Sequence, residues 1–294
     1  MRLQTTIPVI PSPLRLSQQR KILLVGSCFT EHIGQRLRDF GFNVLVNPFG
    51  IMYKPVSIAD CLRRCLQGEE VTASQLIRHE GLWHSWLHHG SFYSSDKEEC
   101  LCRCNDTLRE AHQFLQEPCD IIVTLGTAFV YEHQGHVIAN CHKLPASQFT
   151  KRMLSVEEIV AALNPYKALY TLSPIRHWAD GAHGNQLSKA SLLLAIERLQ
   201  HPYFPAYEIM MDELRDYRFY DQDMLHPSPL AIEIIWERFQ QTYMDADTIA
   251  LGQRYHQLHL LEAHQPLHPG SANAINHQEK IEALRHSLNN RNLN

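Results

Sequence analysis

Apolar residues along the chain fall into short continuous runs separated by longer amphipathic stretches. A short, wholly apolar run that ends at glycine, proline or asparagine is typical of a strand buried on both faces. The pattern therefore predicts five strands of a parallel sheet. They occupy residues 21–25, 42–46, 119–125, 168–172 and, with a less regular pattern, 207–211.

Helical periodicity fills the first interval between these runs. Ile33, Leu37 and Phe40 recur at helical spacing, and Gly41 ends the helix before the second run begins. Residues 21–46 are therefore expected to form a βαβ unit.

The later intervals also carry helix signals. Ser155 and Glu158 form a capping box, an amphipathic helix is expected over about 185–200, and Ser228 with Pro229 opens a helix that ends near residue 243. Regular alternation of strands and helices predicts an α/β fold, a three-layer α/β/α sandwich whose five parallel strands follow the flavodoxin-like order.

The segments outside this alternation divide the chain. We expect an N-terminal arm over residues 1–19, an α/β domain over 20–243 and a helical C-terminal extension over 244–294. Within the domain, residues 55–117 contain two helical patterns around an aromatic, His-rich stretch, and we interpret them as an insertion over the active edge. The C-terminal helices pack either on the domain or on a second copy of the chain, which allows a homodimer.

Composition excludes several classes of protein. Apolar residues make up 44% of the 294 positions, and 27 Lys and Arg stand against 31 Asp and Glu. That balance is globular and lacks the basic footprint of a nucleic-acid binder. No apolar run reaches the roughly 18 residues of a membrane span, and prolines interrupt the start where a signal peptide needs a continuous apolar run. We therefore expect a cytoplasmic protein with no membrane partner, whose eight cysteines are free thiols.

Reactive residues gather in the turns that follow the predicted strands. Because the carboxyl ends of parallel strands meet at one edge, ligands bind there in open sheets. All of these turns fall on that edge, which makes it the expected site. They lie at residues 26–30, 47–50, 126–128, 173–177 and, after the weaker fifth run, 221–226.

One of these turns resembles a known family. Gly26-Ser27-Cys28-Phe29 matches the motif that gives the GSCFA-domain proteins their name, with Thr30 where the family has Ala. That family in turn resembles the SGNH or GDSL hydrolases. The resemblance spans roughly residues 20–243, and its supporting stretches lie at 124–127, 139–143, 172–177 and 214–227.

The SGNH resemblance implies a nucleophile on the first turn and an Asp-x-x-His pair near the end. Asp223 and His226 match that pair, with His226 as general base and Asp223 as the group that fixes its tautomer. Strict alignment places Cys28 at the nucleophile position, although Ser27 is chemically competent too. We favour Cys28, since the N-terminus of the following helix is expected to lower the pKa of its thiol.

The hydrogen-bond donors that would stabilise an oxyanion match the family pattern less completely. The resemblance implies the amide of Gly50 and those of the nucleophile turn, but Ala128 stands where the family block Gly-x-Asn-Asp has its Asn. Another group near that edge must replace the missing donor. The further candidates for oxyanion or substrate binding are Gly126, Thr127, Asn140, His142, Arg176 and His177, of which the last two are as well suited to brace their loop.

The expected function is hydrolysis or transfer of an acyl group from a small or carbohydrate-like ester, without a metal or organic cofactor. Cys100, Cys102 and Cys104 are spaced poorly for structural zinc, which favours Cys pairs two to four residues apart. Two alternatives stay open. One is a thioester hydrolase that uses Cys28, and the other is a non-catalytic ligand-binding protein that keeps the hydrolase fold, for which Ala128 is the strongest sequence argument.

Overall fold

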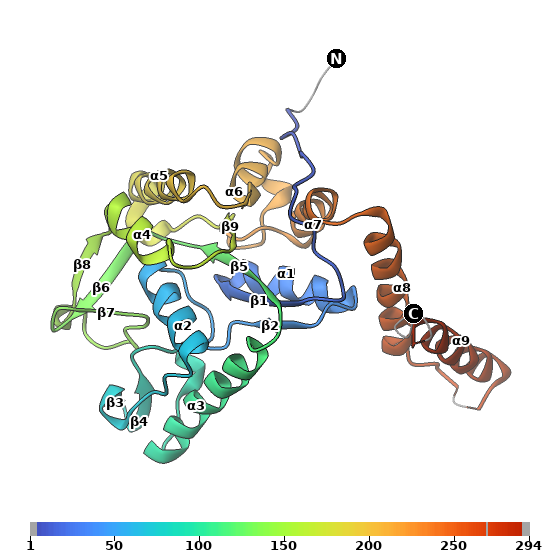
Figure 1. Cartoon of the computed structure of the whole chain (residues 1–294), viewed down its shortest axis with the longest axis horizontal. Coiled ribbons are helices and arrows are strands. Elements are labelled where there is room, and N and C mark those ends of the chain that lie inside the picture. The colour runs from blue at the N-terminus through green and yellow to red at the C-terminus, as the bar shows by residue number, and fades with distance from the viewer. Residues whose placement is uncertain (1–4, 269, 290–294) are drawn as a thin grey trace.

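The computed structural model describes residues 5–268 and 270–289, and a five-stranded parallel sheet forms its centre (Figure 1). Counted along the chain, the sheet strands lie in the order 2-1-3-4-5, which confirms the predicted flavodoxin-like arrangement. From edge to edge they are β2 (Val44–Val46), β1 (Lys21–Gly26), β5 (Cys119–Leu125), β9 (Leu169–Leu172) and β10 (Tyr203–Phe204).

Helices cover one face of the sheet because every second strand residue points into the same apolar cluster. Leu23 and Val25 of β1 and Val123 and Leu125 of β5 are fully buried there. The helices that pack against them are α2 (Pro55–Gln67), α3 (Lys97–Phe114), α4 (Val156–Leu163) and α5 (Gly181–Leu199). Residues 55–117 therefore supply part of this helical layer.

The alternate strand residues face a second cluster on the opposite side. Ile22, Leu24 and Ile122 pack there against α1 (Cys28–Asp39) and α7 (Pro229–Tyr243). The chain is thus a three-layer α/β/α sandwich, as the alternation of strands and helices predicts (Figure 1).

The fifth strand lies earlier in the chain than predicted. The prediction of a strand at 207–211 is wrong, because that segment is helical, with α6 (Ala206–Glu208) followed by a π-helical turn, η5 (Ile209–Glu213). The strand is β10, only two residues long, and Pro205 follows it directly. Proline has no N–H to donate to the sheet and its φ suits the start of a helix. The apolar run at 207–211 is buried as helix, not as strand.

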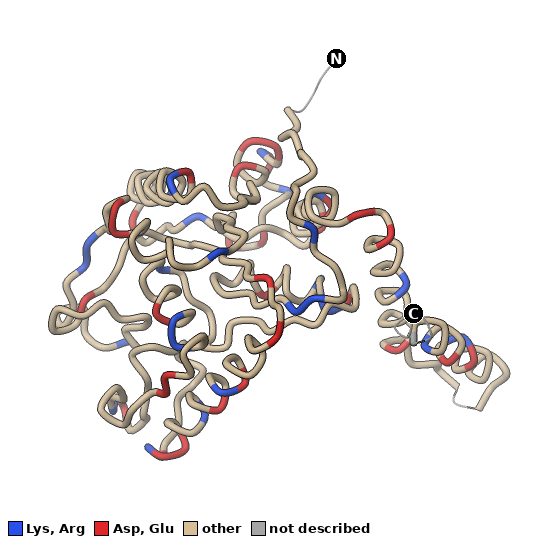
Figure 2. Tube along the Cα trace, viewed as in Figure 1, with Lys and Arg blue, Asp and Glu red and all other residues tan. Residues whose placement is uncertain are grey.

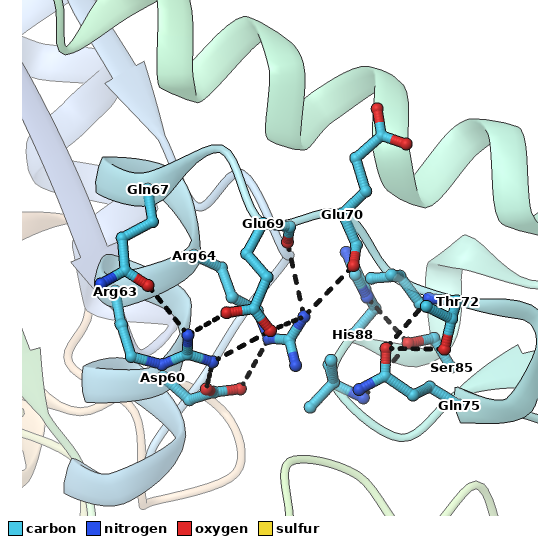
Figure 3. A network of polar contacts seen from close by, with 12 residues as sticks. Asp60, Arg63, Arg64, Gln67, Glu69, Glu70, Thr72, Gln75, Ser85 and His88 are labelled. Carbon is cyan, nitrogen blue, oxygen red and sulfur yellow. Dashed lines mark hydrogen bonds and ion pairs between the residues drawn. The ribbon is translucent and has the colours of Figure 1, made fainter.

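A hairpin separates α2 from α3. The short helix η1 (Ala73–Gln75) leads into β3 (Leu76–His79) and β4 (Leu82–Ser85), and η2 (Gly90–Phe92) follows. Figure 3 shows how the end of α2 is tied to the segment before the hairpin. Arg64 is buried and donates to the Asp60 carboxylate and to the carbonyl oxygens of Glu69 and Glu70. The His-rich stretch is therefore β4 and the loop after it.

A second small sheet was not anticipated. It is antiparallel and pairs β6 (Phe129–His133) with β7 (His136–Ile138) and β8 (Thr150–Met153), with η3 (Ala146–Gln148) between the last two. The Ala139 N–H donates to the Trp86 carbonyl oxygen, which joins this sheet to the loop after β4. Together the hairpin and the small sheet stand beside the carboxyl edge of the main sheet.

The two ends of the chain pack differently. Residues 5–20 run along the end of α7, where Leu16 is buried and its N–H donates to the Tyr243 carbonyl oxygen. At the other end, α8 (Ala246–Ala263) and α9 (Ala272–Asn289) form a helical pair that projects from the sandwich (Figure 1). Gly252 lets α8 lie against Phe40, since a Cβ there would come within 2.1 Å of the ring.

Charged residues of both signs are interspersed along outer helices such as α3 and α9 (Figure 2). Within the described residues, no helix has both the length and the apolar composition that a membrane span requires.

Candidate functional site

A cavity of about 560 Å³ lies at the carboxyl edge of the main sheet. Turns that follow β1, β5 and β9 contribute to its wall, together with the loop before α7 and the segment after β7. The structure thus brings together six of the residues singled out from the sequence: Cys28, Thr127, Asn140, Arg176, His177 and His226.

The turn that carries Ser27 and Cys28, the two candidate nucleophiles, begins at a glycine whose place a larger residue could not take without a clash. Gly26 has a φ of +155°, and a Cβ there would lie 2.3 Å from the Thr124 carbonyl oxygen of β5. Its N–H donates to Oδ1 of Asn47, which is itself buried in the turn after β2. Two neighbouring strand ends therefore fix the direction in which the chain enters α1.

Ser27 and Cys28 face different surroundings. Ser27 is only 1% exposed, and its Oγ donates to Ser173 Oγ at 3.0 Å. Cys28 is the first residue of α1, is partly exposed and lines the cavity that His226 also lines. Of the two candidate nucleophiles, Cys28 is the one whose side chain is in the cavity wall.

The pKa of the Cys28 thiol does not follow the sequence expectation. Burial raises it, although the backbone N–H groups of Cys28 and Phe29 at the start of α1 lower it. Glu31 and Asp223 raise it further. The predicted lowering is wrong because the helix terminus acts on a thiol that is mostly removed from water, and desolvation disfavours the thiolate more strongly than the N–H groups favour it.

Asp223 and His226 form the tight turn that their spacing predicts. His226 Nδ1 lies 2.5 Å from Asp223 Oδ2, and Asp223 Oδ1 accepts the N–H groups of Leu225 and His226 at 2.9 Å each. These hydrogen bonds lower the pKa of Asp223 to about 2. Because the carboxylate is ionised, Nδ1 carries the proton of this contact, and Nε2 is the imidazole nitrogen left to accept a proton.

Three of the predicted donor residues already use their amide or hydroxyl groups within the fold. The Gly50 N–H donates to the Asn47 carbonyl oxygen at 2.7 Å, and the N–H groups of Gly126 and Thr127 donate to the Tyr53 carbonyl oxygen at 2.9 and 3.1 Å. Thr127 Oγ1 shares a hydrogen bond with Ser188. In this structure the Gly50 N–H is used within its own turn and the Gly126 N–H bonds the segment before α2, so neither is unpaired at the cavity.

Asn140 and His142 are two of the candidates to replace the missing Asn donor. Their side chains lie in different surroundings. Asn140 lines the cavity, and its Oδ1 accepts the His142 N–H, which leaves the amide nitrogen as the donor. The His142 ring is buried, does not line the cavity and donates from Nε2 to the Ser85 carbonyl oxygen at 2.7 Å. Its burial lowers its pKa to about 4. His142 therefore lies behind the cavity wall, where it holds the loop after β4.

Arg176 and His177 line the cavity and also brace the loop after β9. The Arg176 guanidinium donates to the Met224 carbonyl oxygen and lies 4.7 Å above the Tyr220 ring. His177 Nε2 donates to the Gly126 carbonyl oxygen at 3.0 Å, and burial lowers its pKa to about 4. Arg176 thereby ties the loop after β9 to the loop that carries His226.

Two buried lysines at this edge were missed. Lys54 lines the cavity and donates from Nζ to the carbonyl oxygens of Ile138 and Ala139, both at 2.9 Å. Lys189 is 1% exposed on the inner face of α5. A signal was present in the sequence, because Lys189 precedes buried Leu192 and Ile196 at helical spacing and so falls on an apolar stripe.

A second cavity of about 530 Å³ adjoins the first and shares Arg176 and Trp178 with it. It also contains Asp223 and Met224 from the turn before α7, and Tyr217 from η6 (Tyr217–Phe219). Trp178, in η4 (Trp178–Asp180), is 56% exposed and Tyr217 is 67% exposed. Two aromatic rings at the mouth of a cavity are typical of a surface that receives a ligand.

The cysteines of α3 lie on different sides of their helix. Cys100 and Cys104 are buried, whereas Cys102 is exposed. Within residues 5–268 and 270–289, no group of three or more His, Cys, Asp or Glu side chains is arranged to hold a metal ion.

The sequence was compared with models of known protein families. The model of the GSCFA family matches residues 21–239, which include the turn with Cys28 and the loop with Asp223 and His226. No curated protein matches the chain.

Proposed function

The chain belongs to the GSCFA family, and we propose that it hydrolyses or transfers an acyl group from an ester, with Cys28 as nucleophile. His226 would be the general base and Asp223 the group that orients it. The observation that carries this proposal is the shared cavity, in which Cys28 lies with His226 while the Ser27 hydroxyl is buried and bonded to Ser173. The Asp-x-x-His spacing also supports the further assignment to SGNH-like hydrolases.

The raised pKa of Cys28 defines what His226 must do. At neutral pH the thiol keeps its proton, so Nε2 of His226 takes that proton as Sγ attacks the ester carbonyl carbon. The protonated imidazole, stabilised by ionised Asp223, then gives the proton to the departing alkoxide. His226 then deprotonates a water molecule, which attacks the carbonyl carbon of the resulting thioester. The C–S bond breaks, the acid is released, and His226 returns the proton to Sγ.

The negative charge that develops on the carbonyl oxygen needs donors. The N–H groups of Cys28 and Phe29 lie in the first turn of α1, where backbone donors have no partner within the helix. The amide nitrogen of Asn140, on the cavity wall, is the side-chain donor that we assign in place of the family Asn. Preorganised donors of this kind account for a large share of catalysis in acyl transfer.

The two adjoining cavities are suited to hold different parts of the substrate. We assign the first to the reacting carbonyl and the second, beyond Arg176, to the remainder of the ester. Trp178 and Tyr217 present exposed aromatic faces there, which suit the apolar face of a small carbohydrate-like ring.

A ligand-binding protein without catalysis is the second candidate, and a specific observation favours it. Ala128 is fully buried and its N–H donates to Ser188 Oγ, so its position offers the cavity no donor. A thioester substrate is the third, because its thiolate leaving group departs more readily than an alkoxide and depends less on acid catalysis.

An acyl-trapping experiment separates these candidates. The protein is mixed with p-nitrophenyl acetate or an acetyl thioester, quenched in acid within the first turnover and digested for mass spectrometry. Acetyl on the Cys28 peptide, absent in Cys28→Ala and retained in Ser27→Ala, is the expected result. Acetyl on Ser27 would assign a serine hydrolase, and neither label nor turnover with either substrate would favour the binding protein. A faster first turnover with the thioester would favour thioester chemistry.

A further inference from the structure

Two cationic side chains line the cavity that contains Cys28 and His226. Lys54 is the N-cap residue of α2, and Arg176 belongs to the loop after β9. Arg176 also lines the adjoining cavity, so this residue lies where the two cavities meet. A ligand that extends from one cavity into the other must therefore pass the guanidinium group.

Both cations lack a counter-ion in the described part of the chain, where no carboxylate forms an ion pair with either of them. Lys54 Nζ donates instead to the carbonyl oxygens of Ile138 and Ala139, which leaves one of its three N–H groups. Arg176 donates to the Met224 carbonyl oxygen, and its buried Nε has no hydrogen-bond partner. Both side chains therefore keep donors and charge that the fold does not use.

The acidic side chains that line the two cavities are already paired. In the first cavity this residue is Asp180, whose carboxylate forms an ion pair with Lys151. In the second it is Asp223, whose oxygens accept hydrogen bonds from the His226 ring and from two N–H groups of its own turn. The charges of Asp223 and Arg176 balance in the second cavity. The excess of positive charge is therefore confined to the first cavity, beside Cys28.

Aromatic rings hold these cations without neutralising them. The Arg176 guanidinium lies 4.7 Å from the ring centre of Tyr220 and 5.7 Å from that of Trp178. Lys54 Nζ lies 5.3 Å from the ring centre of Tyr131. A ring face attracts a cation but has no net charge, so the positive potential in the cavity persists. Burial lowers the pKa of Lys54 to about 8, which leaves the amine mostly protonated at neutral pH.

We propose that the substrate is an ester with an anionic group, a carboxylate or a phosphate, near its reacting carbonyl, and that Arg176 and Lys54 bind this group in the cavity beside Cys28. The inference rests on the proposed acyl hydrolysis or transfer and names the class of ester. A guanidinium offers paired N–H donors to two oxygens of one anion, which a neutral group cannot match. The bound anion would also supply the counter-charge that both buried cations lack.

The test measures binding, so its outcome does not depend on turnover. Full-length Cys28→Ala protein is titrated calorimetrically with benzoate, phenyl phosphate and benzamide, three probes that share a ring and differ in charge. We expect at least one anion to bind about tenfold more tightly than benzamide, as charge-assisted hydrogen bonds do. Tighter binding of phenyl phosphate than of benzoate would assign a phosphate, and the reverse a carboxylate. Benzamide binding as tight as that of both anions, or no binding of either anion, would overturn the proposal.

Two arginine variants in the same background test the guanidinium. Arg176→Gln should weaken binding of the preferred anion about tenfold relative to benzamide. This ratio separates recognition of charge from bracing of the loop, because a displaced loop lowers both affinities. Arg218→Gln is the matched control, since Arg218 in η6 is exposed, pairs with Asp216 and lines neither cavity. An unchanged ratio in Arg176→Gln, or an equal change in both variants, would overturn the proposal.

Lys54→Met keeps the proposal testable if Arg176→Gln does not fold. Methionine fills the wall with an unbranched side chain but removes the charge, so the ratio of anion to benzamide affinity should again fall. An unchanged ratio would overturn the role of the cation pair. Turnover of p-nitrophenyl acetate by the wild type is scored separately. Its absence would remove the proposed hydrolase and leave the anion site, whereas loss of the anion preference would remove the site and leave the hydrolase.

Discussion

The two halves of the candidate active site are built in different ways. Cys28 stands at the end of a strand that is buried on both faces, and its turn is held by Asn47, Thr124 and Ser173 from three other segments. Asp223 and His226 stand on a loop, each with a side chain nearly half exposed. Their geometry is made almost wholly within four residues of chain, by hydrogen bonds that Asp223 accepts.

Because of this difference, substitutions in the two halves should affect stability to different extents. A change in the Cys28 turn disturbs contacts between three segments of the sheet, whereas a change in the Asp223 loop disturbs one turn at the surface. Arg176 joins the two halves, since it lines the cavity and donates to the Met224 carbonyl oxygen between Asp223 and His226. Variants in the loop are therefore the cleaner test of chemistry, and variants in the turn need a stability control.

The largest expected effect on turnover comes from a change at Cys28, in the half of the site that the sheet holds in place. Cys28→Ala should lower turnover of an acyl substrate by a factor on the order of 10⁴ or more, as loss of one member of a coupled catalytic group does. Steady-state kinetics with thermal melting at the same pH measure both consequences. An inactive Ser27→Ala beside an active Cys28→Ala would reverse the assignment, and equal activity in both would remove the nucleophile from this turn.

The next effect belongs to the loop. Asp223→Asn keeps an oxygen to accept the N–H groups of Leu225 and His226 but no longer holds the His226 tautomer, so turnover should fall about 10²- to 10³-fold. The melting temperature should stay near that of the wild type. Asp216→Asn is the matched control, because Asp216 accepts the Arg218 N–H in a similar turn that does not line the cavity. An equal loss of activity in both variants would assign Asp223 a structural role only.

The same contrast explains what the sequence could predict. The positions of β1, β5 and β9, the helix starts at Ser155 and Ser228, and the Asp223–His226 contact depend on local patterns, and all are present in the structure. Donor availability could not be predicted this way. Whether the Gly50 N–H is free depends on the turn that Asn47 begins with a φ of +48°, which the spacing of glycines does not reveal.

Two other features could not be predicted because they depend on tertiary structure. The pKa of Cys28 depends on how completely the surrounding loops exclude water, and no local pattern encodes that burial. The three strands after Ala128 are short, and the residues of β8, Thr150–Met153, are largely exposed and polar, so they lack an apolar run. Lys189 was detectable in principle, as a charge on the apolar stripe of a helix.

Acid should destabilise the fold beside the site through one buried histidine, His88. His88 is fully buried, stacks on Phe49 at 4.2 Å and has an Nε2 without a hydrogen-bond partner, and burial lowers its pKa to about 3, with smaller contributions from Arg64 and His142. The unfolded chain titrates near 6.5, so it binds more protons than the folded chain between pH 3 and 6.5. Stability therefore falls as the pH falls through this window, by about 2 kcal/mol at pH 5 from His88 alone.

Denaturant unfolding at pH 7.5 and pH 5.0 measures that loss. His88→Phe keeps a ring to stack on Phe49 but cannot be protonated, so the difference between the two pH values should shrink by most of the His88 share. Replacement of the exposed His183 by Gln should leave the difference as in the wild type. An undiminished difference in His88→Phe would show that His88 does not contribute to the acid sensitivity.

The smallest effect tests the residue beside the nucleophile. Ser27→Ala removes a buried hydrogen bond and leaves Ser173 Oγ without its donor, so the free energy of unfolding should fall by about 1 kcal/mol. Turnover should change less than tenfold, since Cys28 and the N–H groups of the first turn stay in place. The double variant Ser27→Ala with Ser173→Ala removes both partners and should recover most of the lost stability, because no unsatisfied hydroxyl is then buried. If the double variant is instead less stable than either single variant and turnover falls with it, the pair shapes the nucleophile turn directly, and the division between a sheet-borne nucleophile and a self-contained loop must be redrawn to include Ser173.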